Sequence, residues 1–398
     1  MIEGAIILAA GKGSRLKPFT ESVPKVMLPV ANKPILEYVI ESLVQSGIRK
    51  ITIVVGYKKE TIMDYFENGK KFNANIEYVI QEKQLGTGHA LLQAKKHLTK
   101  KFLVLPGDNI IDSNLLSKII NQDKLSVLVT KSEMPSKYGV VEVENNVITA
   151  LIEKPKEAIG HVISTGIYVL NKEAIEYVDG CVSKGLHKIT DAIQTMIAEG
   201  HKITAIKGEG IWMDAVYPWD LLPLNETSLK NHKSTVAGTI EDGVTIKGNV
   251  FVGKDSIIRS GSYIVGPVVI GTGCEIGPHC SIFSSTAIGN NVSIGPFTEI
   301  RQSIIMDDCR IGSHSSFSNS VIGKGCRIDN NVMQIVGNSS VQIDEDFIYV
   351  KNIGSFIGDD CKIGSSTTID SGKIIGTSCE ISPMKHIQSN IKSSTHVM

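Results

Sequence analysis

Apolar runs and amphipathic helical patterns alternate from residue 1 to about residue 225. Apolar residues spaced by three and four positions predict a helix over 34–46. Short apolar runs predict strands at 5–10, 51–55, 76–80, 102–105 and 125–129. Such alternation favours a mostly parallel sheet covered by helices, in which ligands bind beyond the carboxyl ends of the strands.

Beyond about residue 236 the pattern changes to one aliphatic residue in every six. The repeat occupies Ile240, Ile246, Val252, Ile258, Ile264, Ile270, Ile276, Ile282, Ile288, Ile294 and Ile300, and it resumes at Ile357, Ile363, Ile369, Ile375, Ile381 and Ile387. A period of six fits neither an α-helix nor a hairpin, and it is typical of a parallel β-helix. Each six-residue segment forms one side of a coil, and its aliphatic side chain points inward.

These patterns predict two domains, 1–225 and 236–398, joined by a linker at 226–235. Residues 218–232 are expected to form a connecting helix and part of this linker. The hexad spacing becomes irregular over 306–356, which contains a polar, acidic stretch at 337–346. An excursion from a solenoid is a common place for a binding site. The polar residues after Ile387 predict a frayed tail.

Composition narrows the function classes. The chain has 398 residues, with 41 lysines and arginines against 41 aspartates and glutamates, so no overall field favours nucleic acid or an anionic membrane. No apolar run approaches the roughly 20 residues that span a bilayer, and no targeting pattern opens the chain. We therefore expect a cytoplasmic protein with buried, reduced cysteines and no nucleic-acid or membrane partner.

A glycine-rich, basic loop follows the first predicted strand. Gly11 and Gly13 allow a tight turn that brings backbone N–H groups against phosphate oxygens, while Arg15 and Lys25 add positive charge. The loop is not a dinucleotide fingerprint, because Leu16 replaces the third glycine, and no Gly-Lys-Ser/Thr ending makes it a Walker loop.

The remaining pattern, Gly-x-Gly-x-Arg-Leu-x-Pro followed by Thr20 and Pro24-Lys25, resembles the signature of the sugar-1-phosphate nucleotidyltransferases. The resemblance implies an α/β, Rossmann-like nucleotidyltransferase domain that takes a sugar 1-phosphate and UTP or dTTP. It implies catalytic roles for Arg15 and Lys25, and a nucleotide site along Leu8, Ala10, Gly11 and Gly13.

Residues 81–90, QEKQLGTGHA, resemble the base-reading segment of the UDP-N-acetylglucosamine pyrophosphorylases. By this resemblance Gln81 reads the uracil edge, and Gly86 and Thr87 approach the base through backbone groups. A side-chain amide can distinguish pyrimidine edges because it both donates and accepts hydrogen bonds.

Asp108 directly follows the predicted strand at 102–105. Nucleotidyl transfer brings two anions together, so a hard cation held by carboxylates is required to lower their repulsion. Asp108 matches the catalytic magnesium ligand of the family, and Asp214 resembles the partner aspartate. The sequence therefore predicts a Mg²⁺ site at these two residues.

Sugar recognition is expected from Gly139, Glu153, Lys154 and Thr165, again by resemblance. Ser164 departs from the pattern, because bacterial pyrophosphorylases of this kind usually have asparagine there. The Glu153-Lys154-Pro155 motif is closer to the glucose-1-phosphate thymidylyltransferases. A glucose-1-phosphate thymidylyl- or uridylyltransferase with a non-catalytic β-helix therefore stays open as an alternative.

Nearly the whole chain resembles the bacterial and archaeal bifunctional enzymes that join this uridylyltransferase to a glucosamine-1-phosphate N-acetyltransferase. The resemblance implies a left-handed β-helix, a homotrimer and acetyl-CoA as co-substrate. His314 stands where the archaeal enzymes have their catalytic histidine, and histidine suits a base that deprotonates an attacking amine. Substrate contacts are expected from Arg301, Phe317 and Lys351.

Two departures from the family pattern weaken the prediction of acetyl transfer and keep a scaffold role for the β-helix open. Phe317 replaces a family tyrosine, and the run 329–334 replaces a family motif that ends in asparagine. A regulatory subunit of a translation-initiation exchange factor is a third reading, but such subunits commonly lose catalytic loop residues. Because Arg15, Lys25 and both aspartates are present, we expect an enzyme that makes UDP-N-acetylglucosamine from UTP and N-acetylglucosamine 1-phosphate, with acetylation as a second step.

Overall fold

The computed structural model describes residues 2–155, 160–230 and 232–398. The chain divides into two compact units. The α/β unit comprises Met1–Lys12 and Ile35–Asp214, and the β-helix unit comprises Gly13–Pro34 and Ala215–Met398. The domain prediction treats 1–225 as one segment, whereas this division assigns Gly13–Pro34 to the β-helix unit. The chain therefore enters and leaves the β-helix unit once before it returns there after Asp214.

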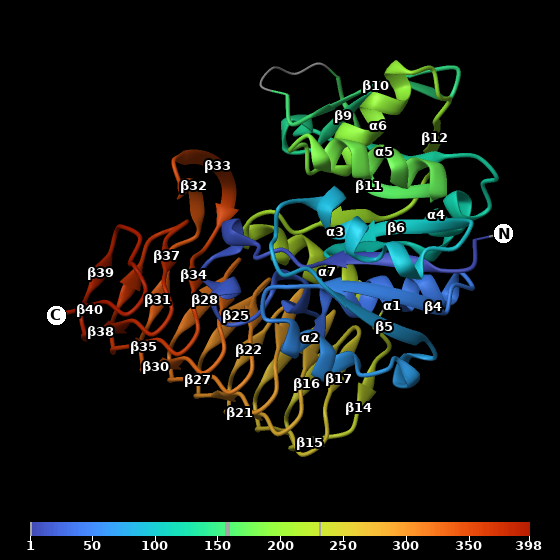
Figure 1. Cartoon of the computed structure of the whole chain (residues 1–398). Helices are drawn as coiled ribbons and strands as arrows, with labels where there is room; N and C mark the ends of the chain where they lie inside the picture. The colour runs from blue at the N-terminus through green and yellow to red at the C-terminus, as the bar shows by residue number, and fades with distance from the viewer. Residues whose placement is uncertain (1, 156–159, 231) are drawn as a thin grey trace. The chain divides into compact units, whose positions relative to one another are not determined.

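A nine-stranded sheet forms the centre of the α/β unit, in the order β5-β4-β1-β6-β11-β8-β12-β10-β9 (Figure 1). Strand β1 (Ala5–Ala9) is parallel to both of its neighbours, β4 (Lys50–Val55) and β6 (Lys101–Pro106). The predicted parallel sheet is present, with antiparallel additions at β11 and at the β9–β10 hairpin. The other strands are β5 (Asn75–Ile80), β8 (Ser126–Lys131), β9 (Gly139–Glu144), β10 (Val147–Glu153), β11 (Val162–Asn171) and β12 (Thr204–Lys207).

Helices connect and cover these strands. Helix α1 (Ile35–Gln45) buries Ile35, Val39 and Leu43, the spacing that predicts it in the sequence. Helix α5 (Lys172–Ser183) begins directly after β11, where the side chain of Asn171 accepts a hydrogen bond from the Ala174 N–H. The other described α-helices of this unit are α2 (Lys59–Phe66), α3 (Thr87–Gln93), α4 (Ser113–Ile120) and α6 (Ile189–Ala198). None of the described helices is long and apolar enough to cross a bilayer.

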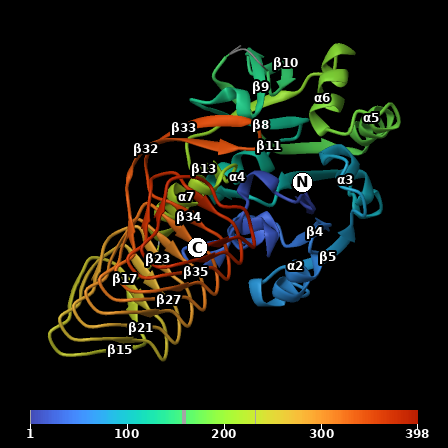
Figure 2. The ribbon, with the colours of Figure 1, turned by 90° about the vertical axis from the view of Figure 1, so that its left-hand side faces the viewer.

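The β-helix unit stacks short strands into three parallel sheets, and Figure 2 shows the coils along the stack. One sheet has the order β15-β18-β21-β24-β27-β30-β35-β38-β40. Helix α7 (Leu221–Lys230) precedes the first coil. The hexad isoleucines face inward and form a continuous buried core with cysteine thiols at its corners. The predicted parallel β-helix is therefore confirmed, and all seven cysteines are buried free thiols.

The strands of the three sheets are β14 (Thr235–Val236), β15 (Thr239–Ile240), β16 (Thr245–Lys247), β17 (Val250–Val252), β18 (Ile257–Ile258), β19 (Tyr263–Val265), β20 (Val268–Ile270), β21 (Glu275–Ile276), β22 (Ser281–Ile282), β23 (Thr286–Ile288), β24 (Ser293–Ile294), β25 (Glu299–Arg301), β26 (Ile304–Ile305), β27 (Arg310–Ile311), β28 (Ser316–Ser318), β29 (Val321–Ile322), β30 (Arg327–Ile328), β31 (Met333–Gln334), β34 (Phe356–Ile357), β35 (Lys362–Ile363), β36 (Thr368–Ile369), β37 (Ile374–Ile375), β38 (Glu380–Ile381), β39 (His386–Ile387) and β40 (His396–Val397).

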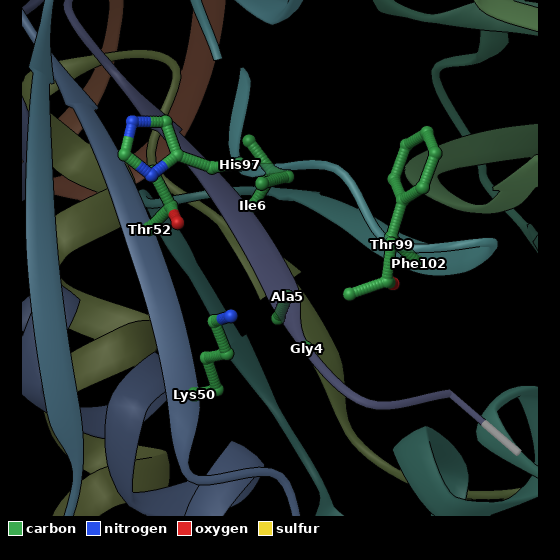
Figure 3. Close-up of a pocket in the computed structure, with 8 residues that line it drawn as sticks. All are labelled: Gly4, Ala5, Ile6, Lys50, Thr52, His97, Thr99 and Phe102. Carbon is green, nitrogen blue, oxygen red and sulfur yellow. The ribbon is translucent and has the colours of Figure 1, made fainter. Parts of the chain in front are cut away.

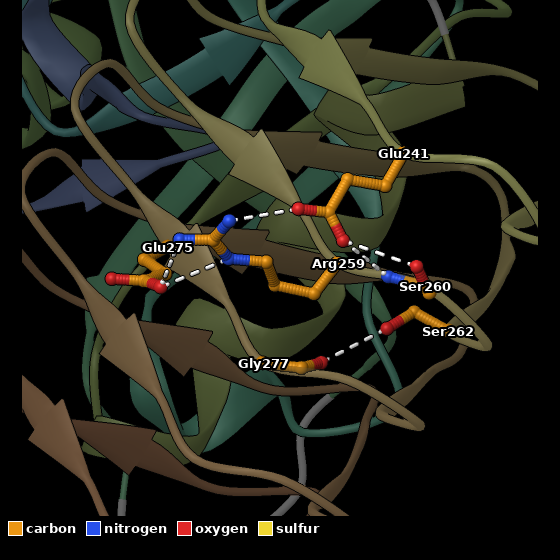
Figure 4. Close-up of polar contacts among 6 residues, drawn as sticks. All are labelled: Glu241, Arg259, Ser260, Ser262, Glu275 and Gly277. Atoms are coloured by element: carbon orange, nitrogen blue, oxygen red, sulfur yellow. Dashed lines mark hydrogen bonds and ion pairs between the residues drawn. The ribbon is translucent and has the colours of Figure 1, made fainter.

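Ion pairs and hydrogen bonds connect neighbouring coils (Figure 4). The Arg259 guanidinium contacts Glu241 on one side and Glu275 on the other, each at 2.7 Å. These pairs are exposed, so they align coils without adding much stability. Inside the wall, the Ser262 hydroxyl donates to the carbonyl oxygen of Gly277 at 2.9 Å and satisfies a buried acceptor.

The irregular spacing over 306–356 has two structural causes. The coil after Ile288 is one residue shorter, since Ile270 pairs with Ile288 but Ile288 pairs with Ile305. The polar stretch forms a hairpin of β32 (Gly337–Ile343) and β33 (Asp346–Ile353). Just before it, Gln334 occupies an inward position, where its amide contacts the buried hydroxyls of Ser320 and Ser355.

The prediction of a frayed tail after Ile387 is wrong. Ile391 forms a parallel bridge with Ile375, and β40 pairs with β38 through Val397 and Ile381. Both Ile391 and Val397 pack against the core. The spacing from Ile387 to Ile391 breaks the hexad period, which hid the last coil in the sequence.

Candidate active site

The carboxyl ends of β1 and β6 lie side by side in the α/β unit. Leu8 pairs with Pro106, and the Gly107 N–H donates to the Leu8 carbonyl at 3.0 Å. A Cβ at Gly107 would lie 3.2 Å from atoms of Ile7, Ala9 and Leu36, so the chain packs tightly at this turn. This packing places Asp108 beside the end of β1, where Ala10 and Gly11 begin the predicted nucleotide loop.

A two-stranded ribbon connects the neighbourhoods of Asp108 and Asp214. Strand β7 (Asn109–Ile111) pairs antiparallel with β13 (Trp212–Asp214), and Asp214 lies opposite Asn109. In the orientation that satisfies its amide, Asn109 donates to Oδ1 of Asp108 at 3.2 Å and accepts from Nε1 of Trp212 at 3.1 Å. The structure thus joins the two segments that carry the predicted metal ligands, since Asp214 lies opposite the residue that follows Asp108.

Tyr138 adds a second contact to this ribbon. Its hydroxyl donates to Oδ1 of Asp214 at 2.7 Å, and its ring meets the Trp212 ring edge to face at 5.6 Å. Tyr138 directly precedes Gly139 in the chain, and nothing in the sequence pairs it with an aspartate almost eighty residues away.

The donor set fits Mg²⁺. The described residues contain no group of three or more histidine, cysteine and acidic side chains that could hold a metal by themselves. Mg²⁺ prefers oxygen ligands and commonly uses one or two carboxylates together with waters and substrate phosphates. Two carboxylates at strand ends match this coordination habit better than that of zinc or calcium, which need more protein ligands.

The predicted base-reading segment folds over Gln81, which is only 3% exposed. Its Nε2 donates to the Gly86 carbonyl at 3.2 Å and lies 2.9 Å from Nδ1 of His89. The Gly88 N–H and the Thr87 hydroxyl bond to the segment that begins α6: Gly88 donates to His187, and Thr87 accepts from Ile189. Residues 86–89 are therefore held by Gln81 and by the segment that begins α6.

The predicted sugar contacts are only partly available to a ligand. Gly139 lies opposite Glu153 in the β9–β10 hairpin, and Glu153 is 3.7 Å from Nζ of Lys188. The Thr165 hydroxyl is buried and donates to the carbonyl oxygen of Leu128, so it holds β11 against β8. Lys154 is exposed and donates its backbone N–H to the Tyr138 carbonyl.

Thr190 is a residue that the sequence analysis missed. Its Oγ1 is buried and has no hydrogen-bond partner among the described residues, and its methyl group would be 3.7 Å from a Cβ at Gly139. A buried hydroxyl without a partner is uncommon and indicates a place where a polar ligand can bind. The sequence does not reveal this residue, because Thr190 lies near Gly139 only in the folded chain.

The rest of the glycine-rich loop belongs to the β-helix unit. Gly13 has a φ of 67°, and the Thr20 hydroxyl donates to its carbonyl at 2.9 Å. A Cβ at Gly13 would be 2.7 Å from the Cβ of Lys25. The loop is therefore packed closely around Gly13, which contacts Thr20 and Lys25, and it also carries Arg15. Its convergence with Asp108 on one nucleotide stays a prediction.

The predicted acetyltransferase residues do not form one cluster. Phe317 is fully buried at an inward position, so its ring packs in the core and cannot contact a substrate outside the β-helix, contrary to expectation. The His314 ring stacks on Phe297 at 5.0 Å, and Phe297 stacks on His279. Arg301 lies on the coil that precedes that of His314, where Glu299 binds it at 2.8 Å and its guanidinium covers the Phe283 ring. Lys351 is exposed on β33.

Two hollows in the α/β unit contain none of the predicted site residues. The one in Figure 3, lined by Lys50, Thr52 and His97 among others, has a volume of about 10 Å³ and holds at most one water. A larger one of about 380 Å³ is lined by Ile2, Ile48, Lys101 and Asp123 among others. Neither lies at the carboxyl ends of β1 and β6.

Solved structures support the α/β fold. One match is titled "Putative Glucose-1-Phosphate Thymidylyltransferase from Bacillus anthracis in Complex with a Sucrose". It has a TM-score of 0.54 and 27% identity, over 58% of this chain and 98% of that one. A UDP-glucose pyrophosphorylase complexed with UDP-glucose matches with a TM-score of 0.52 and 26% identity, over 58% of this chain and all of that one.

Curated relatives extend over the whole chain. A "Bifunctional protein GlmU" from Methanococcus maripaludis strain C7 is 38% identical, covering 99% of this chain and 96% of the relative. The protein of that name from Methanocaldococcus jannaschii is 35% identical over 99% and 97%. A "Bifunctional sugar-1-phosphate nucleotidylyltransferase/acetyltransferase" from Sulfurisphaera tokodaii is 35% identical over 95% and 96%.

Family models divide the chain into two parts. The model of the GMPPB C-terminal domain matches residues 264–396, within the β-helix. The nucleotidyl transferase model matches residues 4–230, more than half of the chain, and includes the loop, the base-reading segment and both aspartates. The chain therefore belongs to the nucleotidyl transferase family and is a sugar-1-phosphate nucleotidyltransferase.

Proposed function

We propose that the protein transfers a uridylyl group from UTP to N-acetylglucosamine 1-phosphate, giving UDP-N-acetylglucosamine and pyrophosphate. The observation that carries the proposal is the β7–β13 ribbon, which pairs Asp214 with Asn109, the residue that follows Asp108. The bifunctional names of the archaeal relatives, whose whole length this chain matches, support this choice of reaction.

The reaction needs no covalent enzyme intermediate. A phosphate oxygen of the sugar 1-phosphate forms a bond to the α-phosphorus of UTP, and the bond from that phosphorus to the bridging oxygen breaks. Pyrophosphate leaves with the electron pair. Catalysis is therefore mainly positioning and electrostatic stabilisation of the phosphates.

Each predicted residue then has a physical role. Arg15 and Lys25 stabilise charge on the leaving pyrophosphate, and Asp108 and Asp214 would hold Mg²⁺. The metal would neutralise phosphate charge in the site. Gln81 orients the base through the loop that it holds, since its amide bonds the Gly86 carbonyl.

The sugar end of the site would use the β9–β10 hairpin. Glu153 would accept hydrogen bonds from sugar hydroxyls, and the absence of a side chain at Gly139 would let the sugar approach the backbone. Thr190, with its unsatisfied buried hydroxyl near Gly139, offers a further polar contact. Lys154 would contact the sugar phosphate.

Glucose 1-phosphate with dTTP or UTP is the alternative substrate pair. Ser164 keeps this alternative open, because it stands where bacterial UDP-N-acetylglucosamine pyrophosphorylases usually have asparagine. Its hydroxyl lies 3.3 Å from the Tyr168 hydroxyl and accepts from the Gly166 N–H at 3.2 Å. A panel of five nucleoside triphosphates against glucose, glucosamine and N-acetylglucosamine 1-phosphates, read by pyrophosphate release, decides between the two. Preference for UTP with N-acetylglucosamine 1-phosphate supports the proposal, and preference for glucose 1-phosphate contradicts it.

The second proposed activity is acetylation of glucosamine 1-phosphate by acetyl-CoA in a homotrimer. The printed name of the Sulfurisphaera relative supports it, and His314 would act as the base. The test is coenzyme A release with glucosamine 1-phosphate, comparing the intact protein with His314→Ala. Thiol release that depends on His314 supports acetylation. Release no higher than background in the intact protein leaves the β-helix as a scaffold.

A further inference from the structure

The loop Gly13–Pro34, called here the signature loop, carries Arg15 and Lys25 but packs on coils of the β-helix. It docks there at two places, one near Glu21 and one near Asn32. Both docking places and their β-helix partners belong to the same compact unit.

Glu21 makes the first docking contact through a single carboxylate oxygen. Its Oε2 accepts hydrogen bonds from the Thr377 hydroxyl at 2.6 Å and from the Ser393 hydroxyl at 2.9 Å. The Ser393 hydroxyl oxygen also accepts from the Thr377 N–H at 3.1 Å. Thr377 and Ser393 follow Ile375 and Ile391, which form the last bridge of their sheet, so one carboxylate joins two consecutive coils.

The residues on either side of Glu21 contact the preceding coil. A Cβ at Gly358 would be 2.8 Å from the Cβ of Pro18, so the loop lies against a glycine corner that admits no side chain. The Ser22 side chain hydrogen-bonds the Asp359 carboxyl. Pro18, Glu21 and Ser22 thus lie across the corners of three successive coils.

The second docking place is at the end of the loop. Nδ2 of Asn32 donates to the Ile288 carbonyl at 2.6 Å, and the Ala31 N–H donates to Asn225 at 2.8 Å. Ala31 is also buried in a small apolar cluster with Val269 and Ala287. The two docking places fix the loop on both sides of Lys25.

Contacts inside the loop transmit this fixation to the cationic residues. The Thr20 hydroxyl, next to Glu21, binds the Gly13 carbonyl, and Gly13 packs directly on Lys25. Arg15 lies in the short helix Ser14–Leu16, between Gly13 and Thr20. A shift at Glu21 therefore moves Gly13, Arg15 and Lys25 together.

We propose that Glu21 is a positioning residue for nucleotidyl transfer, which holds Arg15 and Lys25 in place by binding Thr377 and Ser393 on the last coils of the β-helix. The inference rests on the proposed function. It makes the C-terminal coils part of the nucleotidyl-transfer machinery, whether or not they support acetyl transfer. The contact of Glu21 with Thr377 and Ser393 is called here the joint. Hydrogen bonds to a carboxylate are among the stronger kinds, so they can keep the joint fixed during the reaction.

The test compares kcat and KM for UTP in pyrophosphate release by the full-length protein. Glu21→Ala and the double variant Thr377→Val with Ser393→Ala should each lower kcat/KM about 10- to 100-fold, the scale expected when catalytic groups are misplaced by about 1 Å. Because both variants break the same joint, combining all three substitutions should add little to either. Glu21→Gln keeps an accepting oxygen and should recover much of the loss.

Hydrogen exchange provides a readout besides activity, since the Glu21→Ala loop should lose amide protection over 13–34. The matched control is Glu380→Ala, another carboxylate on a late coil that pairs only with Lys362 and His396 in the described structure. It should change neither quantity. Thermal unfolding shows whether each variant is folded. If Glu21→Ala does not fold, the double variant Thr377→Val with Ser393→Ala tests the proposal instead.

Unchanged kcat/KM and unchanged loop protection in the double variant would overturn the inference. An intact protein without nucleotidyl transfer on any substrate pair would instead overturn the proposed function, and the loop protection would still report on the joint.

Discussion

The Tyr138 hydroxyl donates a 2.7 Å hydrogen bond to the Asp214 carboxylate, whose strand partner is Asn109, next to Asp108. The hairpin that carries Gly139 and Glu153 is thereby connected to the carboxylates proposed to hold Mg²⁺. One phenol therefore joins the predicted sugar-binding hairpin to the predicted metal site.

Tyr138→Phe should raise the Mg²⁺ concentration that gives half-maximal activity about 10-fold, because partners that orient metal ligands typically contribute that much or more to metal affinity. The measurement is pyrophosphate release at a series of Mg²⁺ concentrations with saturating substrates. A matched control is Tyr349→Phe, which changes an exposed tyrosine on β33. An unchanged Mg²⁺ dependence in Tyr138→Phe would show that Asp214 needs no orientation by the phenol.

Asp108→Asn and Asp214→Asn should each reduce nucleotidyl transfer at least about 100-fold with the fold retained, because an amide is a much poorer ligand for a hard divalent cation. The assay is steady-state pyrophosphate release, and circular dichroism checks the fold. Asp64→Asn, an exposed carboxylate on α2, should behave like the intact protein. Activity near normal in either site variant would remove that residue from the metal site.

Gly86→Ala should destabilise the protein by about 1–3 kcal/mol and weaken UTP binding, because the added methyl group would lie 2.5 Å from the His187 carbonyl oxygen. Urea unfolding and the KM for UTP measure the two effects. The control is Gly180→Ala, on α5 with no atom within 4 Å, which should be neutral or stabilising. If the two variants were equally stable, the base-reading loop would be less tightly packed than the structure indicates.

Asp359 should make stability depend on pH at the loop's docking place. Burial raises the pKa of the Asp359 carboxyl above its ordinary value, and Asp360 raises it further, while Ser22 and Lys324 lower it. A raised carboxyl pKa means that the folded state favours the protonated form of Asp359. The free energy of unfolding is therefore highest at low pH and falls as the pH rises through that pKa.

Asp359→Asn should therefore be more stable than the intact protein by a margin that grows from pH 4 toward neutrality and then levels off. Urea midpoints for both proteins across that range provide the measurement. A margin that shrinks as the pH rises would mean that the charged carboxylate is favoured in the fold.

The hexad isoleucines made the β-helix predictable, because a repeated inward position is a local property of the sequence. The same holds for β1, β4, β5 and β6, whose apolar runs are continuous, and for Asp108, which directly follows a strand. The pairing of Tyr138 with Asp214 and the role of Thr190 were not predictable, since they depend on distant segments meeting.

Two predictions failed for physical reasons. Phe317 stands where the family has a tyrosine, but it stacks on the inward Ile300, and its burial excludes the substrate contact that the resemblance implies. The last coil escaped notice because only Ile391 and Val397 face the core in a polar stretch. Docking of Glu21 on that coil was therefore equally invisible in the sequence.

The central claim is that cations of the signature loop and the two strand-end carboxylates act on one nucleotide. The most direct measurement is pyrophosphate release from UTP and N-acetylglucosamine 1-phosphate by the intact protein, Lys25→Ala, Asp108→Ala and the double variant. The account predicts activity only in the intact protein, with the double variant no worse than either single one. Full activity in both single variants would contradict it.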